Sequence, residues 1–189
     1  MQAQPSTTAA PEHKSLVYHS IVVILASLLL TISAKIEVPF YPVPMTMQTC
    51  VVVGLGLVLG WQRAVMAVGL YLAQGAMGLP VFAGTPEKGI GLAYMMGPTG
   101  GYLLGFLPAA AAAGWAAAKG FAAKPYLSFP TTILGMAIIY TFGVMWLGVL
   151  LGFDKPLLEW GIYPFILGDV LKAALASIAA ALIVKKYRI

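Results

Sequence analysis

The amino-acid sequence predicts an all-α integral membrane protein with six transmembrane helices. The chain of 189 residues is 60% hydrophobic and 9% charged, and its mean hydropathy is +0.90. A soluble domain is about 45–50% apolar and about 25% charged. Structures that span a bilayer are helices or closed barrels, and barrel strands alternate polar and apolar residues. The long unbroken apolar runs of this chain therefore indicate a helix bundle.

Six apolar segments follow a polar tail over residues 1–13, which we expect to be frayed. We expect one domain over residues 14–189, with transmembrane helices at 16–34, 45–60, 63–80, 99–118, 130–151 and 162–184. Crossing a bilayer takes roughly 20 helical residues. The second segment is shorter, so we expect it to form a tightly turned or tilted pair with the third, joined around Arg63. The first run is longer than the h-region of a signal peptide, about 7–15 residues, which favours a retained helix.

The basic residues are distributed unevenly between the two sides of the predicted bundle. One side has the seven residues Lys14, Arg63, Lys119, Lys124, Lys185, Lys186 and Arg188. The other side has only Lys35, Lys88 and Lys155, together with four acidic residues. The positive-inside rule then places both termini in the cytoplasm. An even number of spans requires the same arrangement, so we expect a multi-pass protein of the cell membrane.

The two long outer loops differ from the short connections on the cytoplasmic side. Loop 1, "KIEVPFYPVPMT", has three prolines, and proline restricts the backbone. Loop 3, "LPVFAGTPEKGIGLAYMMGPTGG", is rich in glycine, which permits close approach of the backbone to a ligand. We therefore expect a site that opens outward beneath these loops.

Asp169 and Lys172 lie inside the sixth apolar segment, where charges are costly. A helix starting near Ile162 would place Asp169 roughly 10 Å below the outer surface, and the i,i+3 spacing puts both residues on one face. One hypothesis is a structural ion pair. The other, which we favour, is that both groups face a cavity, where a carboxylate accepts hydrogen bonds from ligand N–H groups and an ammonium binds a ligand carboxylate.

A further candidate for the ligand site is the turn "MGPTGGYLLGF" over residues 96–106. Gly100 and Gly101 permit close backbone approach beside Tyr102, and a helix N-terminus presents free N–H groups. A simple helix-start turn explains this stretch equally well. The sequence contains no Walker A motif, no H-E-x-x-H, no G-x-S-x-G and no carboxylate cluster within a span. We therefore expect neither an enzyme nor a chain that binds ATP, a metal or nucleic acid.

Small residues recur at four-residue spacing in three of the predicted helices. They are Ser27 and Thr31, Gly56 and Gly60, and Ala110, Gly114 and Ala118. This spacing permits close helix contact in lipid. Packing within the bundle is the favoured interpretation, and docking to another membrane subunit is the alternative.

Four stretches together resemble the BioY family, the biotin-specific substrate-binding (S) components of energy-coupling-factor (ECF) transporters. They are "YPVPMTMQT" (41–49), "GLPVFAG" (78–84), "GPTGGYLLGF" (97–106) and "GDVLKAALA" (168–176). The resemblance covers roughly residues 16–184 and implies a six-helix S-component fold that captures biotin from outside. It also implies a transmembrane coupling (T) subunit and ATPase (A) subunits that use ATP, with no cofactor bound by this chain. For docking to the coupling subunit, it favours the face of the first helix with Ala26, Ser27 and Thr31.

The resemblance assigns the acid and the lysine of the sixth predicted transmembrane helix to the substrate site. We expect the substrate-binding residues to be Asp169, Lys172, Tyr41, Gln48, Lys88, Gly100, Gly101 and Tyr102. By charge logic, Asp169 accepts from the ureido ring of biotin and Lys172 neutralises its carboxylate. A stand-alone transporter of biotin or another small carboxylate, without ATPase partners, is the alternative function.

Overall fold

The computed structural model describes the backbone of residues 11–187 and the side chains of residues 16–187. Its elements are α1 (Pro11–Lys35), β1 (Glu37–Val38), β2 (Met45–Thr46), α2 (Gln48–Leu59), α3 (Trp61–Ala76), α4 (Gly91–Met95), α5 (Gly100–Ala118), α6 (Pro125–Leu151), α7 (Leu157–Gly161), the 3₁₀ helix η1 (Tyr163–Phe165) and α8 (Ile166–Tyr187). Within this range, four segments are long and apolar enough to cross a membrane: Leu16–Lys35, Gly100–Ala118, Pro125–Leu151 and Leu157–Tyr187. The protein is therefore a mostly helical membrane protein.

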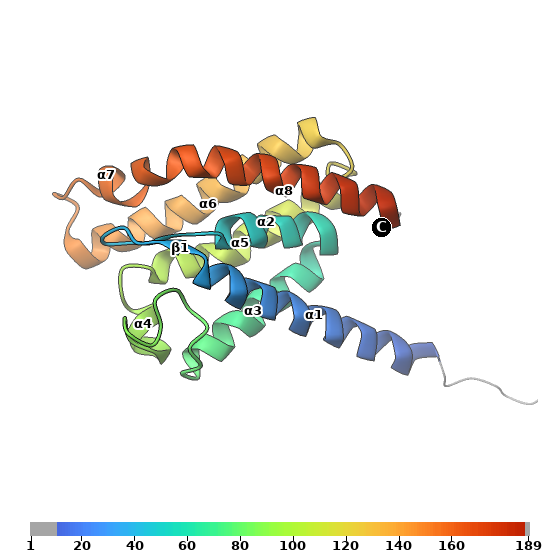
Figure 1. The fold of residues 1–189 in the computed structure, drawn as a ribbon, viewed down its shortest axis with the longest axis horizontal. Coiled ribbons are helices and arrows are strands. Elements are labelled where there is room, and N and C mark those ends of the chain that lie inside the picture. The colour runs from blue at the N-terminus through green and yellow to red at the C-terminus, as the bar shows by residue number, and fades with distance from the viewer. Residues whose placement is uncertain (1–10, 188–189) are drawn as a thin grey trace, which may run out of the picture.

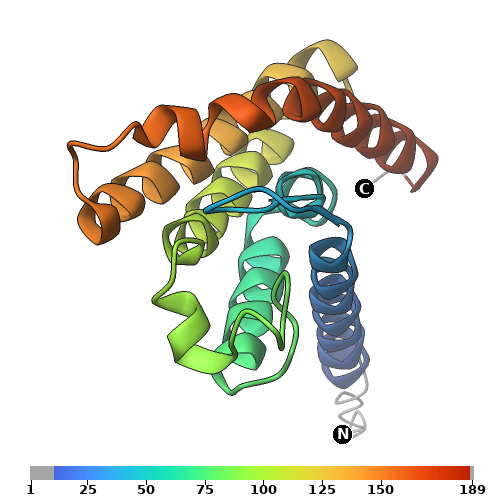
Figure 2. The ribbon, with the colours of Figure 1, turned by 60° about the vertical axis from the view of Figure 1, so that its left-hand side comes forward.

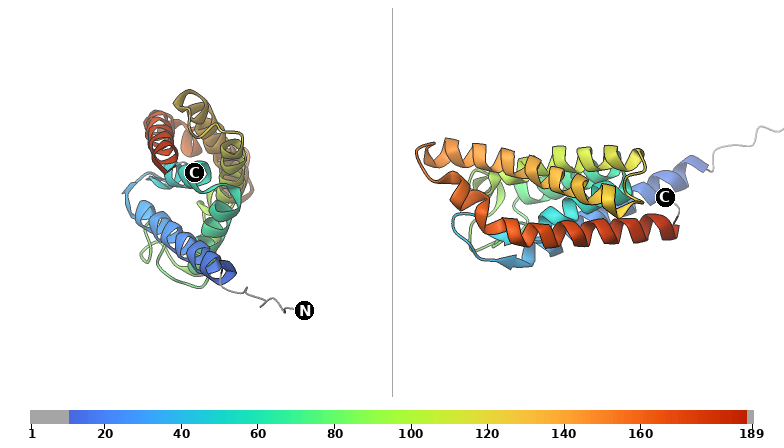
Figure 3. Two further views of the ribbon diagram at one scale, coloured as in Figure 1. Left: turned by 90° about the vertical axis from the view of Figure 1, so that its right-hand side faces the viewer. Right: turned by 90° about the horizontal axis from the view of Figure 1, so that it is seen from above.

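The long helices form a bundle around α5 (Figure 1). Helix α5 packs against α6, α2 and α3, while α1 packs on α3 and α8 packs on α2 and α6. Figure 2 shows α1 and α3 on one side of the molecule and α6 and α8 on the other, and the end-on view of Figure 3 shows the same division. Residues of α2 and α5 thus lie at the centre, between the two groups of helices.

The connection between α2 and α3 is a single residue, Gly60. Its φ of 78° lies in the left-handed region that favours glycine. The expected tightly turned pair is present, but the turn lies at Gly60 rather than around Arg63, which lies in the first turn of α3. Gly56 and Gly60 therefore do not share one helix. Gly56 packs α2 onto α5, since a Cβ there would lie 2.6 Å from the Cβ of Ala113.

The start of the last helix also differs from the expected one at Ile162. Residues 157–165 form the short helices α7 and η1, and α8 begins at Ile166. Pro164 explains the interruption, because proline inside a helix removes a hydrogen bond and clashes with the preceding turn. Asp169 therefore lies in the first turn of α8. A carboxylate is favourable there because it faces the positive end of the helix dipole.

The expected tail over residues 1–13 overlaps α1, which begins at Pro11, and its first ten residues lie outside the described part of the chain.

One end of the molecule has the start of α1, the α2–α3 turn, the α5–α6 connection and the end of α8 (Figure 1). The long loops lie together at the opposite end. The long loops and the short connections therefore lie at opposite ends of the bundle.

The two long loops are ordered by specific hydrogen bonds. Loop 1 contains an antiparallel hairpin that pairs β1 with β2. Loop 3, between α3 and α5, is held by Lys35, whose ammonium donates to the carbonyls of Phe82 (2.9 Å) and Thr85 (3.1 Å). The hydroxyl of Tyr94 donates to the carbonyl of Ala83 (2.8 Å), and burial raises the pKa of this phenol, so it stays a donor. These contacts fix the loops above the bundle.

Most of the small residues on these faces pack inside the bundle, whereas Ala118 is exposed. The side chain of Ser27 is fully buried and donates to Gln74 of α3 at 2.7 Å. Ala26 is buried as well, and Gly114 lies against the backbone at the start of α3. Packing, the favoured interpretation of this spacing, thus agrees with these contacts. The outward face of α1 consists of large aliphatic side chains instead.

Candidate functional site

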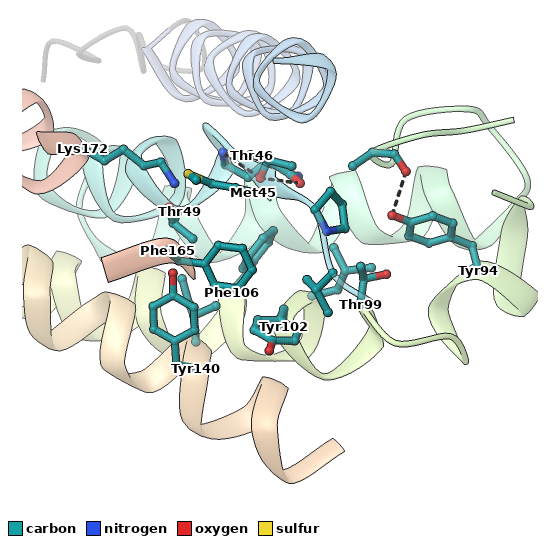
Figure 4. A pocket seen from close by; sticks show the side chains of 16 residues that line it. Met45, Thr46, Thr49, Tyr94, Thr99, Tyr102, Phe106, Tyr140, Phe165 and Lys172 are labelled. Atoms are coloured by element: carbon teal, nitrogen blue, oxygen red, sulfur yellow. Dashed lines mark hydrogen bonds between the residues drawn. The ribbon is translucent and has the colours of Figure 1, made fainter. Parts of the chain in front are cut away.

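A cavity lies beneath the two long loops, between α2, α5, α6 and α8 (Figure 4). It has about 490 Å³ of empty space, a volume that includes its open mouth. Loop 1, loop 3, these four α-helices and η1 contribute to its wall. The lining residues are Val43, Pro44, Met45, Thr46, Gln48, Thr49, Ala83, Tyr94, Thr99, Tyr102, Leu103, Phe106, Ile139, Tyr140, Phe165 and Lys172.

Lys172 is the charged residue of this wall. Its ammonium lies 3.0 Å from Oδ1 of Asp169, and the two side chains are 8% and 7% exposed. The hydroxyl of Tyr140 donates to Oδ2 of the same carboxylate. Asp169 itself does not line the cavity, and its two oxygens accept hydrogen bonds from Lys172 and Tyr140.

This arrangement determines what the cavity can bind. Lys172 and Asp169 form a neutral pair, so the wall has donors without a net charge. An ammonium has three N–H groups, and Asp169 takes one of them. The remaining donors suit an acceptor oxygen. A neutral acceptor fits better than a carboxylate, because a second buried anion beside Asp169 would lack compensation.

Aromatic rings form much of the remaining wall. The rings of Tyr140 and Phe165 are stacked, with centroids 5.9 Å apart, and Tyr102 meets Tyr140 edge to face at 6.1 Å. The hydroxyl of Tyr102 donates to the carbonyl of Gly161 at 3.0 Å, which ties α5 to α7. Together with Phe106, these rings make an apolar space around the donors of Lys172.

Three of the expected site residues line the cavity: Gln48, Tyr102 and Lys172. Gln48 donates through Nε2 to the hydroxyl of Tyr71 (2.7 Å), and Tyr71 donates in turn to the carbonyl of Val81 in loop 3 (3.3 Å). Asp169 lies directly behind Lys172 and acts on the cavity through it. The structure thus brings four of the eight expected residues together.

The other four expected residues do not line this cavity. Tyr41 is 90% exposed at the tip of loop 1, and Lys88 faces Glu37 at 3.9 Å beside a separate hollow. Gly100 and Gly101 allow close packing instead. A Cβ on Gly100 would collide with the carbonyl of Met95, and one on Gly101 with Trp146 of α6.

Sequence reasoning did not single out several residues of the cavity wall. Tyr140 lies in an apolar run, where an aromatic residue has no distinguishing pattern, and Phe106 is the last residue of the stretch 97–106 that carries part of the resemblance. Thr49 belongs to the stretch that carries the resemblance, but its direction depends on where α2 begins. Among the described residues, no three His, Cys, Asp or Glu side chains gather in a way that would bind a metal ion.

Comparisons with known proteins agree with this fold and site. The model of the BioY family matches residues 5–189. A protein of Pyrococcus horikoshii described as a probable biotin transporter BioY is 39% identical over 152 residues, which are 80% of this chain and 87% of that protein. The biotin transporter BioY of Thermotoga maritima is 38% identical over 152 residues, which are again 80% of this chain and 87% of that protein.

A solved structure shows the same fold. It is the crystal structure of the S-component for biotin from an ECF-type ABC transporter, with a TM-score of 0.76 and 26% identity over 95% of both chains. The described helices therefore have the S-component fold, and the names of these relatives describe transport rather than catalysis. The resemblance expected from the four sequence stretches is confirmed: the chain belongs to the BioY family.

Proposed function

We propose that this chain captures biotin as the S component of an ECF vitamin transporter. The observation that supports it most directly is the likeness over 80–95% of the chain to biotin transporters and to an S-component for biotin. The cavity supports it independently. Biotin has a polar ureido group on an apolar bicycle with an aliphatic tail, and the wall offers the Lys172 ammonium among aromatic and aliphatic side chains.

We propose that the ureido carbonyl of biotin accepts hydrogen bonds from Lys172. This departs from the expectation that Lys172 neutralises the ligand carboxylate and Asp169 binds the ring. Asp169 is not part of the cavity wall, and its neutral pair with Lys172 suits a neutral acceptor. Asp169 is then a positioning residue that orients the ammonium. Equilibrium binding of biotin to the purified full-length chain in detergent tests the proposal, and absence of binding contradicts it.

The proposal includes partners that energise release. A T subunit would hold the chain and two ATPases would drive the cycle. Uptake of labelled biotin is measured in cells with the chain alone and with the complete ECF module. Uptake that requires functional ATPases supports the proposal. Equal uptake without them supports the alternative of a stand-alone transporter.

We further propose six transmembrane helices in the cell membrane with both termini in the cytoplasm. Helices α2 and α3 are about 18 and 24 Å long at about 1.5 Å per residue, and we propose that each crosses the membrane together with its adjoining loop. The basic residues Arg63, Lys119, Lys124 and Lys185 lie at the end of the bundle with the short connections. Reporter tags at the α2–α3 turn and at the C-terminus should read cytoplasmic, and a tag near Lys88 should read external. An external C-terminus contradicts this topology.

Loops 1 and 3 are proposed to form a lid over the captured ligand. Residues of both loops line the cavity, including Met45 and Ala83. Biotin should therefore protect single cysteines introduced within residues 36–46 and 82–96 from labelling. The native Cys50 is buried and gives a low background. Equal labelling with and without biotin would count against a lid.

A further inference from the structure

The hydroxyl of Thr49 differs from the other threonine hydroxyls of the described helices. Its Oγ1 is buried and has no hydrogen-bond partner among the described residues. The only other such side-chain atom in that part of the chain is Oε2 of Glu37, whose carboxylate faces Lys88. Most buried polar groups in proteins are hydrogen-bonded, and each exception calls for a reason.

The position of Thr49 in α2 explains why its hydroxyl is unpaired. Within helices, threonine usually donates to the carbonyl four residues earlier. Four threonines of the described helices do so, at 2.8–3.2 Å: Thr31, Thr131, Thr132 and Thr141. Thr49 is the second residue of α2, and the residue four positions earlier, Met45, belongs to strand β2. Its hydroxyl therefore has no helical turn to donate to.

The Thr49 side chain is part of the cavity wall. Thr49 lines it from α2, and Lys172 lines it from α8, which packs against α2 (Figure 4). The neighbouring Thr46 is already engaged, because its hydroxyl donates to Oε1 of Gln48 at 3.4 Å and accepts from the backbone N–H of Gln48 at 3.3 Å. Thr49 is thus a polar group of the wall whose hydrogen bond the protein itself does not satisfy.

We propose that Thr49 donates a hydrogen bond to the ligand and determines specificity together with Lys172. This inference rests on the proposed capture of biotin and adds a second donor for an acceptor oxygen of the ligand. Burying that oxygen without its donor is costly, so Thr49→Val should lower biotin affinity roughly 5- to 150-fold. Thr49→Ser keeps the hydroxyl and should stay within about threefold of the wild type, on the same reasoning.

The melting temperature of the ligand-free protein separates this role from a structural one. Valine has nearly the shape of threonine, so Thr49→Val removes an unpaired buried hydroxyl and should leave the melting temperature unchanged or raise it. Thr132→Val is the matched control. The Thr132 hydroxyl donates to the carbonyl of Ser128 at 2.9 Å and does not line the cavity. Its loss should lower the melting temperature and leave affinity unchanged.

The experiment measures biotin affinity and melting temperature for the four full-length proteins in detergent. Wild-type affinity in Thr49→Val overturns the inference while the proposed function stands. Equal loss in Thr49→Ser and Thr49→Val also overturns it, because shape rather than the hydroxyl would then matter. A melting temperature of Thr49→Val that falls as in Thr132→Val overturns it as well. Failure of the wild type to bind biotin contradicts the proposed function, and the inference falls with it.

Discussion

Replacement of Lys172 by methionine tests how the cavity recognises its ligand. Methionine keeps most of the side-chain volume and removes the ammonium. Lys172 and Asp169 are both buried, with Nζ and Oδ1 3.0 Å apart. Truncating one partner of a buried, charge-assisted contact costs about 2–5 kcal/mol, so affinity for biotin should fall about 30- to 5,000-fold. Part of this loss comes from the uncompensated carboxylate of Asp169.

Three ligands resolve the origin of the loss. Biotin and its uncharged amide share the ureido carbonyl, so both should lose affinity by the same factor in Lys172→Met. In 2-iminobiotin a guanidinium replaces this group. The wild type should reject it, because like charges brought together cost several kcal/mol. In the variant the guanidinium can pair with Asp169, so the preference for biotin should shrink by at least about tenfold on the same grounds.

The assay is isothermal titration of all three ligands, with melting temperatures alongside. The double variant Lys172→Met/Asp169→Asn removes both charges and serves as the control for the stranded carboxylate. A selective loss of biotin relative to its amide would refute the reasoning, because the ammonium would then bind the ligand carboxylate. A lower melting temperature with an unchanged preference for biotin over 2-iminobiotin would show that the pair is structural.

Three further substitutions test the surroundings of the site. Tyr140→Phe removes the donor to Asp169, so biotin affinity should fall about 5- to 150-fold while the fold stays normal. If titration shows wild-type affinity, Asp169 orients the ammonium without the Tyr140 hydroxyl. Gly101→Ala should destabilise the protein by about 1–3 kcal/mol, because its Cβ collides with α6. The control Gly54→Ala has open space around its Cβ and should be neutral or stabilising. Equal melting temperatures of the two variants would contradict this packing. Ser27→Leu overpacks a buried site and should lower the melting temperature; a normal melting temperature with lost assembly would assign that face to docking.

The sequence by itself determined the class of protein and where its helices are. Hydropathy is a local property, so the apolar run at residues 16–34 lies within α1, and the run at 99–118 matches α5 to within one residue. The four stretches 41–49, 78–84, 97–106 and 168–176 together identified the family, because the order of the motifs in 41–49 and 97–106 is specific. The helix boundaries were predicted less accurately than the helices themselves. The interruption at Pro164 moved the start of α8 to Ile166, and Asp169 came to lie in the first turn of that helix.

Only the tertiary structure decided which groups face the cavity. Lys172 and Asp169 share one helix face, yet Tyr140, 29 residues from Asp169 in the sequence, occupies one carboxylate oxygen and the lysine occupies the other. Gly101, in a stretch typical of the family, turns toward α6, while Thr49 faces the cavity. A cavity wall is made of side chains from several elements, and the rotation of each helix is set by packing against its neighbours. That packing depends on contacts between residues distant in sequence, which no local pattern encodes.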